Sequence, residues 1–104
     1  MNLADIQQHF RENRFMESRH ARNERLGDNL TLQAVEDAVA DGQILEQYSD
    51  TGRGESCLVV GNSGETPIHV VCGWSGPEQS EVVIITVYRP GLPKFSDPWT
   101  RQKL

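Results

Sequence analysis

"TPIHVVCGW", residues 66–74, has the pattern of a β-strand with a titratable residue at its centre. Ile68, Val70 and Cys72 are apolar, whereas His69 carries an imidazole. Side chains of a strand alternate between the two faces of a sheet, so His69 points away from the face that Ile68 and Val70 share. The role of His69 therefore depends on which other residues point to its own face.

Three further strand-like stretches accompany the strand over residues 67–74. They are "QILEQYS" (43–49), "SCLVVG" (56–61) and "EVVIITVYR" (81–89). The segments between the four stretches, "DTGRGE", "NSGET" and "SGPEQS", have the composition of turns. Short connections make neighbouring strands antiparallel, so the sequence predicts a four-stranded antiparallel sheet.

The start of the chain is predicted to be helical. Residues 3–25 contain no proline or glycine, and Ile6 and Phe10 follow helical spacing. The segment forms either one helix or two helices with a break near residues 15–18. In the second case Ser18 caps the second helix.

A further helix is predicted over residues 32–41. Thr31 is placed to cap its start, and Gly42 follows its end. Val35 and Val39 belong to its buried stripe. This helix directly precedes the first predicted strand.

The chain has the size of one domain, residues 1–104. Its helices precede its strands, which predicts an α+β fold with N-terminal helices packed on one face of the sheet. Residues 90–104 contain three prolines and are predicted to form an irregular C-terminal tail, packed through Phe95 and Trp99.

Alternation along the four strands predicts which side chains face the helices. The face against the helices gathers Leu45, Leu58, Val60, Ile68, Val70, Cys72, Val83, Ile85 and Val87. The opposite face gathers Glu46, Tyr48, His69, Thr86 and Tyr88. These polar groups donate, accept or exchange protons, and an imidazole titrates near pH ~6.5, which suits general acid–base catalysis. The alternative is a structural His69, held by a hydrogen bond to Glu46 or Tyr88.

Arginines are concentrated near the start of the chain, although the net charge of the chain is −5. "RHARNER" (19–25) supplies His20, Arg22 and Arg25, and arginine binds phosphate bidentately. The alternative is a solvated helix surface with Glu–Arg pairs. The overall negative charge excludes a generally basic nucleic-acid-binding protein.

Cys57 and Cys72 fall inside apolar strands and are predicted to be buried thiols. No Cys-x-x-Cys or His-x-x-x-His pair accompanies them, so we expect no metal and no cofactor. No apolar run approaches the ~20 residues of a membrane span, and the N-terminus has no pattern of a secretory signal. We therefore expect no membrane contact and a cytoplasmic location.

Several motifs together resemble a known family. They are "RHARNERLGDNLTLQAVEDAVADGQILEQYSD", "SCLVVG", "TPIHVVCGW", "IITVYRP" and "DPW". Over about residues 18–101 the chain resembles a bacterial domain of unknown function, family number 4258, with Leu26-Gly27 where that family usually has Arg-Gly. Residues 1–17 are an extra N-terminal helical stretch. The helices and sheet of that family look like those of RelE- and BrnT-type toxin nucleases (a RelE/BECR-like fold), which cut RNA without a metal.

The first functional hypothesis follows from this resemblance: a metal-independent ribonuclease of the toxin type. Its candidate catalytic residues are His69, Glu46, His20 and Tyr88. Its candidate substrate-binding residues are Arg22, Arg25, Tyr48 and Arg89. The partners of such a protein are RNA and a cognate antitoxin.

The second hypothesis is a non-catalytic module that binds a protein partner or a ligand through the polar sheet face. The net charge of −5 favours this hypothesis, because proteins that bind RNA phosphates usually carry an excess of basic residues. The two hypotheses differ in whether His69 performs chemistry or only packs.

Overall fold

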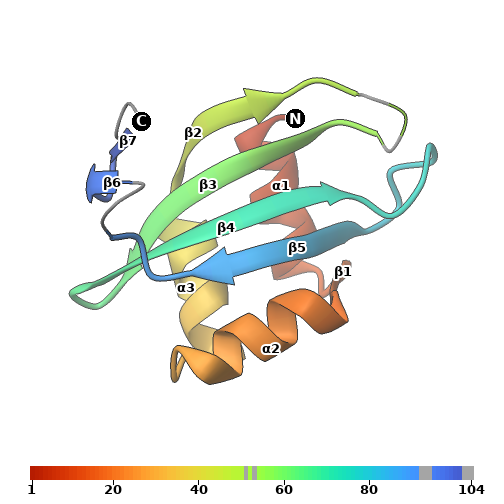
Figure 1. Cartoon of the computed structure of the whole chain (residues 1–104). Helices are drawn as coiled ribbons and strands as arrows, with labels where there is room; N and C mark the ends of the chain where they lie inside the picture. Colours follow the sequence, from red (N-terminus) through yellow and green to blue (C-terminus); the bar gives the residue numbers. More distant parts are fainter. Residues whose placement is uncertain (51, 53, 92–94, 102–104) are drawn as a thin grey trace.

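The strand around His69 lies at the centre of a five-stranded sheet, with the first and third helices on one side of it and the second helix along one edge (Figure 1). The computed structural model describes residues 1–50, 52, 54–91 and 95–101. The helices are α1 (Leu3–Arg11), α2 (Arg19–Gly27) and α3 (Leu32–Asp41). The main sheet contains β1 (Phe15–Glu17), β2 (Gln43–Tyr48), β3 (Ser56–Ser63), β4 (Thr66–Trp74) and β5 (Val82–Tyr88). A separate two-stranded sheet contains β6 (Phe95–Asp97) and β7 (Thr100–Arg101).

The strand order of the main sheet is β1-β5-β4-β3-β2, with β1 parallel to β5 and the other neighbours antiparallel. The α+β class and the four predicted strands are therefore confirmed. The four-stranded antiparallel description is incomplete, because β1 adds a parallel strand at one edge. β1 has only 3 residues, too few for an alternating pattern to be visible in the sequence.

The N-terminal segment forms two helices rather than one. α1 ends before Asn13, whose φ of +56° lies in the left-handed region that a helix cannot continue through. The hydroxyl of Ser18 accepts a hydrogen bond from the backbone N–H of Ala21, so Ser18 is the N-cap that the sequence predicts. Thr31 caps α3 in the same way, through the N–H of Ala34.

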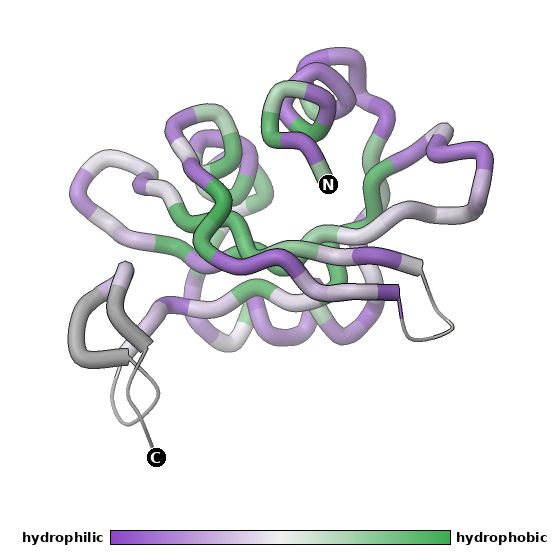
Figure 2. The backbone as a smooth tube through the Cα atoms, turned by 90° about the horizontal axis from the view of Figure 1, so that it is seen from above, coloured by the Kyte–Doolittle hydropathy of each residue, from purple (hydrophilic) through white to green (hydrophobic). Residues whose placement is uncertain are grey.

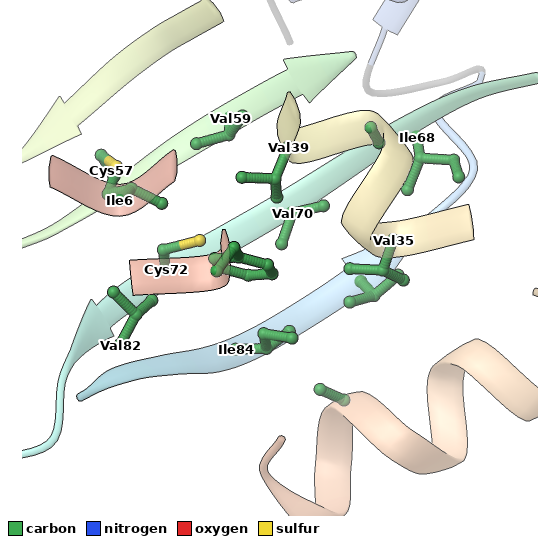
Figure 3. Packing of buried hydrophobic residues seen from close by; sticks show 14 of the residues in the cluster. Ile6, Val35, Val39, Cys57, Val59, Ile68, Val70, Cys72, Val82 and Ile84 are labelled. Atoms are coloured by element: carbon green, nitrogen blue, oxygen red, sulfur yellow. The ribbon is translucent and has the colours of Figure 1, made fainter. Parts of the chain in front are cut away.

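The hydrophobic core lies between the sheet and the two helices α1 and α3. Figure 3 shows Ile6 of α1 and Val35 and Val39 of α3 over the apolar side chains of the sheet. The buried sheet residues of this core that Figure 3 labels are Cys57, Val59, Ile68, Val70, Cys72, Val82 and Ile84. These residues confirm the predicted row of β4 but correct the rows of β3 and β5. Ile44, which packs against the same core, corrects the row of β2.

β3 turns Cys57 and Val59 to the helices, rather than Leu58 and Val60. Both rows of this strand are apolar, so alternation alone gave no signal. In β5 and β2 the predicted faces are wrong because each strand contains a register shift. The extra residue reverses the alternation of side chains on either side of it. In β5, Val82 and Ile84 face the helices in place of the predicted Val83 and Ile85. In β2, Ile44 faces the helices in place of the predicted Leu45.

α2 covers the edge of β5 beyond the short β1. The hydroxyl of Ser18 donates to the carbonyl of Ile85 at 3.1 Å, and the carboxylate of Glu24 accepts from the N–H of Val87 at 3.2 Å. Backbone groups at an open sheet edge invite pairing with another chain. Side chains of α2 and its cap thus take the place of a neighbouring strand.

The tail that was predicted to be irregular forms a short hairpin in its described part. β6 and β7 pair antiparallel, with a turn at Pro98 and Trp99. The turn at Pro98 and Trp99 lies against the sheet face that His69 occupies. The side chain of Phe95 lies outside the described residues, and Trp99 is partly exposed. The predicted packing through Phe95 is therefore untested, whereas the turn at Pro98 reaches His69.

Candidate functional site

We call the sheet face away from α1 and α3 the open face (Figure 2). Strand register arranges its side chains in three rows. The first row is Met16, Val83, Gly73, Ser56 and Tyr48. The second row is Glu46, Leu58, Val71 and Thr86, and the third is Val60, His69 and Tyr88. The register thus places on the open face the five polar residues that the sequence grouped there.

His69 is fully buried, with both ring nitrogens in hydrogen bonds. Its Nε2 lies 2.5 Å from the carbonyl oxygen of Pro98, and its Nδ1 lies 3.2 Å from the hydroxyl of Tyr88. A carbonyl can only accept, so Nε2 carries the proton and the Nδ1 of a neutral ring accepts from Tyr88. The histidine thus joins β4 and β5 to the turn between β6 and β7.

Glu46 and Tyr48 form a second pair, within β2. The Tyr48 hydroxyl donates to the Glu46 carboxylate at 2.6 Å. Glu46 lies in the second row and His69 in the third, two strands apart, which is roughly 10 Å across a sheet. Of the two predicted anchors of His69, Tyr88 lies within hydrogen-bond distance of its Nδ1.

Arg25 lies at the β5 edge in a largely buried ion pair with Glu17 of β1. Its Nε donates to one carboxylate oxygen at 2.6 Å, and its Nη2 donates to the other at 3.1 Å. Its Nη1 donates to the carbonyl of Leu30 at 3.1 Å. The Glu17 carboxylate raises the pKa of Arg25. All three nitrogens of this guanidinium therefore hold β1 and the end of α2 together.

The remaining predicted residues lie along the same edge. His20 is exposed, with its Nε2 3.2 Å from the carboxylate of Glu24 one helical turn away. Arg22 is exposed on α2. The Nε of Arg89 donates to the carbonyl of Asp28 at 3.0 Å. The structure thus divides the predicted site into one group on the open face and another at the β5 edge.

The sequence analysis missed the part of the open face that is uncovered. Met16 and Ile85 have exposed fractions of 47% and 38%. Ile85, Tyr48 and Trp74 line a hollow of about 500 Å³ beside Gly73. The register of β1 places Met16 beside Val83, and the bulge in β5 turns Ile85 to this face; neither feature leaves a mark in the sequence.

The two cysteines face each other across β3 and β4, and both are free and buried. Burial raises the pKa of Cys57 to about 11 and raises that of Cys72 further. The thiolate is the form that binds metals and attacks electrophiles, so both thiols are inert in the folded protein. Among the described residues, no three His, Cys, Asp or Glu side chains gather as metal ligands.

This burial predicts a loss of stability in alkali. Above the ordinary thiol pKa of 9.0 the unfolded chain releases protons that the folded chain keeps, so stability falls as the pH rises toward about 11 for Cys57. Each cysteine contributes a slope of about 1.4 kcal/mol per pH unit. Urea unfolding at a series of pH values measures the slope. The double variant Cys57→Ala/Cys72→Ala should show a distinctly flatter decline, and an unchanged slope would contradict the assignment.

The chain belongs to the family described as a domain of unknown function, DUF4258, whose model matches residues 18–89. The match begins at Ser18, so α1 and β1 lie before it. It ends at Arg89, so the "DPW" motif of the tail lies beyond it. Comparison with curated proteins and with solved structures gave no match. The likeness to RelE- and BrnT-type nucleases is therefore still a hypothesis.

Among the described residues, no helix is both long enough and apolar enough to cross a membrane.

Proposed function

We propose that this protein is a non-catalytic interaction module that binds a partner protein through the uncovered part of its open face. The observation that carries the proposal is that one part of the open face is buried and another part is exposed. In the third row Val60 and His69 are buried and His69 bonds to the turn at Pro98, whereas Met16 of the first row and the neighbouring Ile85 are exposed.

Two features argue against catalysis by the predicted residues in this arrangement. A general base must reach the proton that it removes, but the Nε2 of His69 is already in a hydrogen bond with the carbonyl of Pro98. A nuclease also needs cations near the scissile phosphate, yet Arg25 and Arg89 are bound to groups at the β5 edge. The net charge of −5 adds to this argument.

A ribonuclease is the second candidate, because His69, Tyr88, Glu46 and Tyr48 share one sheet face. In that function the turn at Pro98 has to leave His69 before RNA can bind. Regulated expression in a bacterial host tests it, with RNA integrity and growth as readouts. We expect neither RNA cleavage nor growth arrest. Cleavage by the wild-type protein that is lost in a folded His69→Gln variant would establish the nuclease and overturn the interaction proposal.

Site-specific photo-crosslinking in the native host tests the interaction directly. A photoreactive amino acid is placed at Met16 on the open face or, as a matched control, at the exposed Gln33 of α3 on the other side of the molecule. We expect a discrete protein adduct from position 16 and none from position 33. The adduct should disappear when Ile85→Asp is added to the crosslinking chain. Equal labelling from both positions, or none from position 16, would contradict the proposal.

A further inference from the structure

His9 is a buried histidine that the proposed function does not use. It lies in the last turn of α1, and its ring packs edge-on against the indole of Trp74, with ring centroids 5.1 Å apart. Its Nδ1 lies 2.7 Å from the backbone carbonyl oxygen of Asp5. A carbonyl can only accept a hydrogen bond, so Nδ1 carries a proton whether the ring is neutral or charged.

The other ring nitrogen of His9 faces two groups with opposite requirements. Its Nε2 lies 3.1 Å from the carbonyl oxygen of Gln79, in the loop between β4 and β5, and also 3.1 Å from the Nη1 of Arg14. The carbonyl can only accept, and the guanidinium can only donate. A protonated Nε2 therefore bonds to Gln79, whereas an Nε2 without a proton bonds to Arg14. The charge of the ring selects between the two partners.

The loop that contains Gln79, residues 75–81, is held in an uncommon conformation. Gln79 has a φ of +56°, in the left-handed region that residues with a side chain rarely adopt. Its N–H donates to the carbonyl of Gly76 at 3.0 Å, which closes the loop. Together with Trp74, the loop lines a hollow of about 600 Å³. A hydrogen bond from His9 to Gln79 stabilises this conformation and fixes one wall of the hollow.

Charged groups around the ring of His9 allow Arg14 to change its partner. The Nε of Arg14 donates to the carboxylate of Glu12 at 2.7 Å, so Arg14 keeps an ion pair when it leaves a charged His9. Hydrogen bonds from Gln8 and Arg14 lower the pKa of Glu12, which keeps this carboxylate ionised. The other elements around the ring contribute acidic side chains, namely Asp5 of α1, Glu55 beside the Trp74 indole, and Glu78 and Glu81 of the loop.

We infer that His9 is a proton-dependent switch between α1 and the loop of residues 75–81. The charged ring donates to the carbonyls of Asp5 and Gln79 and holds the loop, whereas the neutral ring accepts from Arg14 and releases the loop. An imidazole changes its charge between about pH 5 and pH 8, so the loop is held at the acidic end of this range and released at the alkaline end. The switch lies on the helix side of the sheet and is independent of the proposed function.

Nitrogen NMR and hydrogen exchange of the full chain measure the two states. At about pH 8.5 we expect a neutral His9 with its proton on Nδ1, whereas His69, as the internal control, carries its proton on Nε2. After correction for the intrinsic exchange rate, the amide of Gln79 should be protected about tenfold more strongly at about pH 5.5 than at about pH 8.5. The titration of the His9 ring and the protection of the loop should share one midpoint.

Two arginine variants test the competition at Nε2. Arg14→Ala removes the competing donor, so the loop should stay protected to a higher pH. Arg11→Ala is the matched control, because it removes the same charge from an exposed position at the end of α1, and it should move the midpoint much less. In His9→Gln the protection of Gln79 should be equal at both pH values.

Three results would each overturn the switch. They are a neutral His9 with its proton on Nε2, a loop whose protection does not follow the titration of the ring, and equal shifts of the midpoint in Arg14→Ala and Arg11→Ala. If His9→Gln does not fold, the position of the proton and the two arginine variants still decide the question.

Discussion

Replacing Gly61 with alanine is expected to lower the free energy of unfolding by at least about 3 kcal/mol. A Cβ atom at this position of β3 would lie 1.9 Å from the backbone carbonyl oxygen of Ala38 in α3. Gly42, at the end of the same helix, lies 3.0 Å from that Cβ position. Because the obstructing atoms belong to the backbone, α3 as a whole has to move away from the sheet, and this disturbs the packing of Val35 and Val39.

Urea unfolding of Gly61→Ala against wild type measures the effect. Gly27→Ala is the matched control, because no atom lies within 4 Å of its Cβ position at the end of α2. That variant should be neutral or more stable by a few tenths of a kcal/mol to about 1 kcal/mol. Adding Ala38→Gly should not rescue Gly61→Ala, since the clash is with the backbone of residue 38. A loss below about 1 kcal/mol in Gly61→Ala would show that α3 is not seated on β3 as described.

Local signals in the sequence were sufficient for the elements and their ends. Ser18 and Thr31 are both found as N-caps, because a hydroxyl before a helix satisfies a backbone N–H that has no partner inside it. β4 and β5 were visible as apolar runs between turn residues. β1 was not, because its pairing with β5 is a contact between distant parts of the chain and its 3 residues carry no local pattern.

The assignment of side chains to faces was harder than the assignment of strands. The bulge at Ile85 reverses the alternation of β5, and nothing in "EVVIITVYR" marks where an extra residue is inserted. In β3 both rows are buried, because the helices cover Cys57 and Val59 while Leu58 and Val60 are buried on the other face. Equal burial on two sides leaves no contrast for a pattern to detect.

The composition of the candidate site was predicted better than its connections. The polar residues of the open face were grouped correctly, since they occupy register positions two residues apart on antiparallel strands. Their hydrogen bonds depend on distances across strands and on the tail, which alternation does not contain. The sequence therefore could not tell that the two ring nitrogens of His69 pair with Tyr88 and Pro98.

His69→Ala is expected to cost about 3 kcal/mol of stability and to loosen the turn between β6 and β7. The substitution removes a hydrogen-bond partner from the Tyr88 hydroxyl and one from the Pro98 carbonyl, at about 1–3 kcal/mol for each buried group. Tyr88→Phe removes only the first of these bonds and should cost about 1 kcal/mol. His69→Gln keeps an N–H donor and a carbonyl acceptor, so it should recover part of the loss.

Hydrogen exchange distinguishes a structural histidine from one kept for chemistry. If His69 holds the turn, His69→Ala should raise the exchange of residues 95–101 far more than that of β3, whereas Tyr88→Phe should raise it little. This contrast follows from the geometry, because the Nε2 of His69 lies beside the carbonyl of Pro98, whereas the Tyr88 hydroxyl bonds to the Nδ1 of His69. An unchanged stability and unchanged exchange in His69→Ala would mean that the imidazole contributes little to the fold. A buried imidazole with no structural effect would strengthen the case for catalysis, and the ribonuclease would then be the better hypothesis.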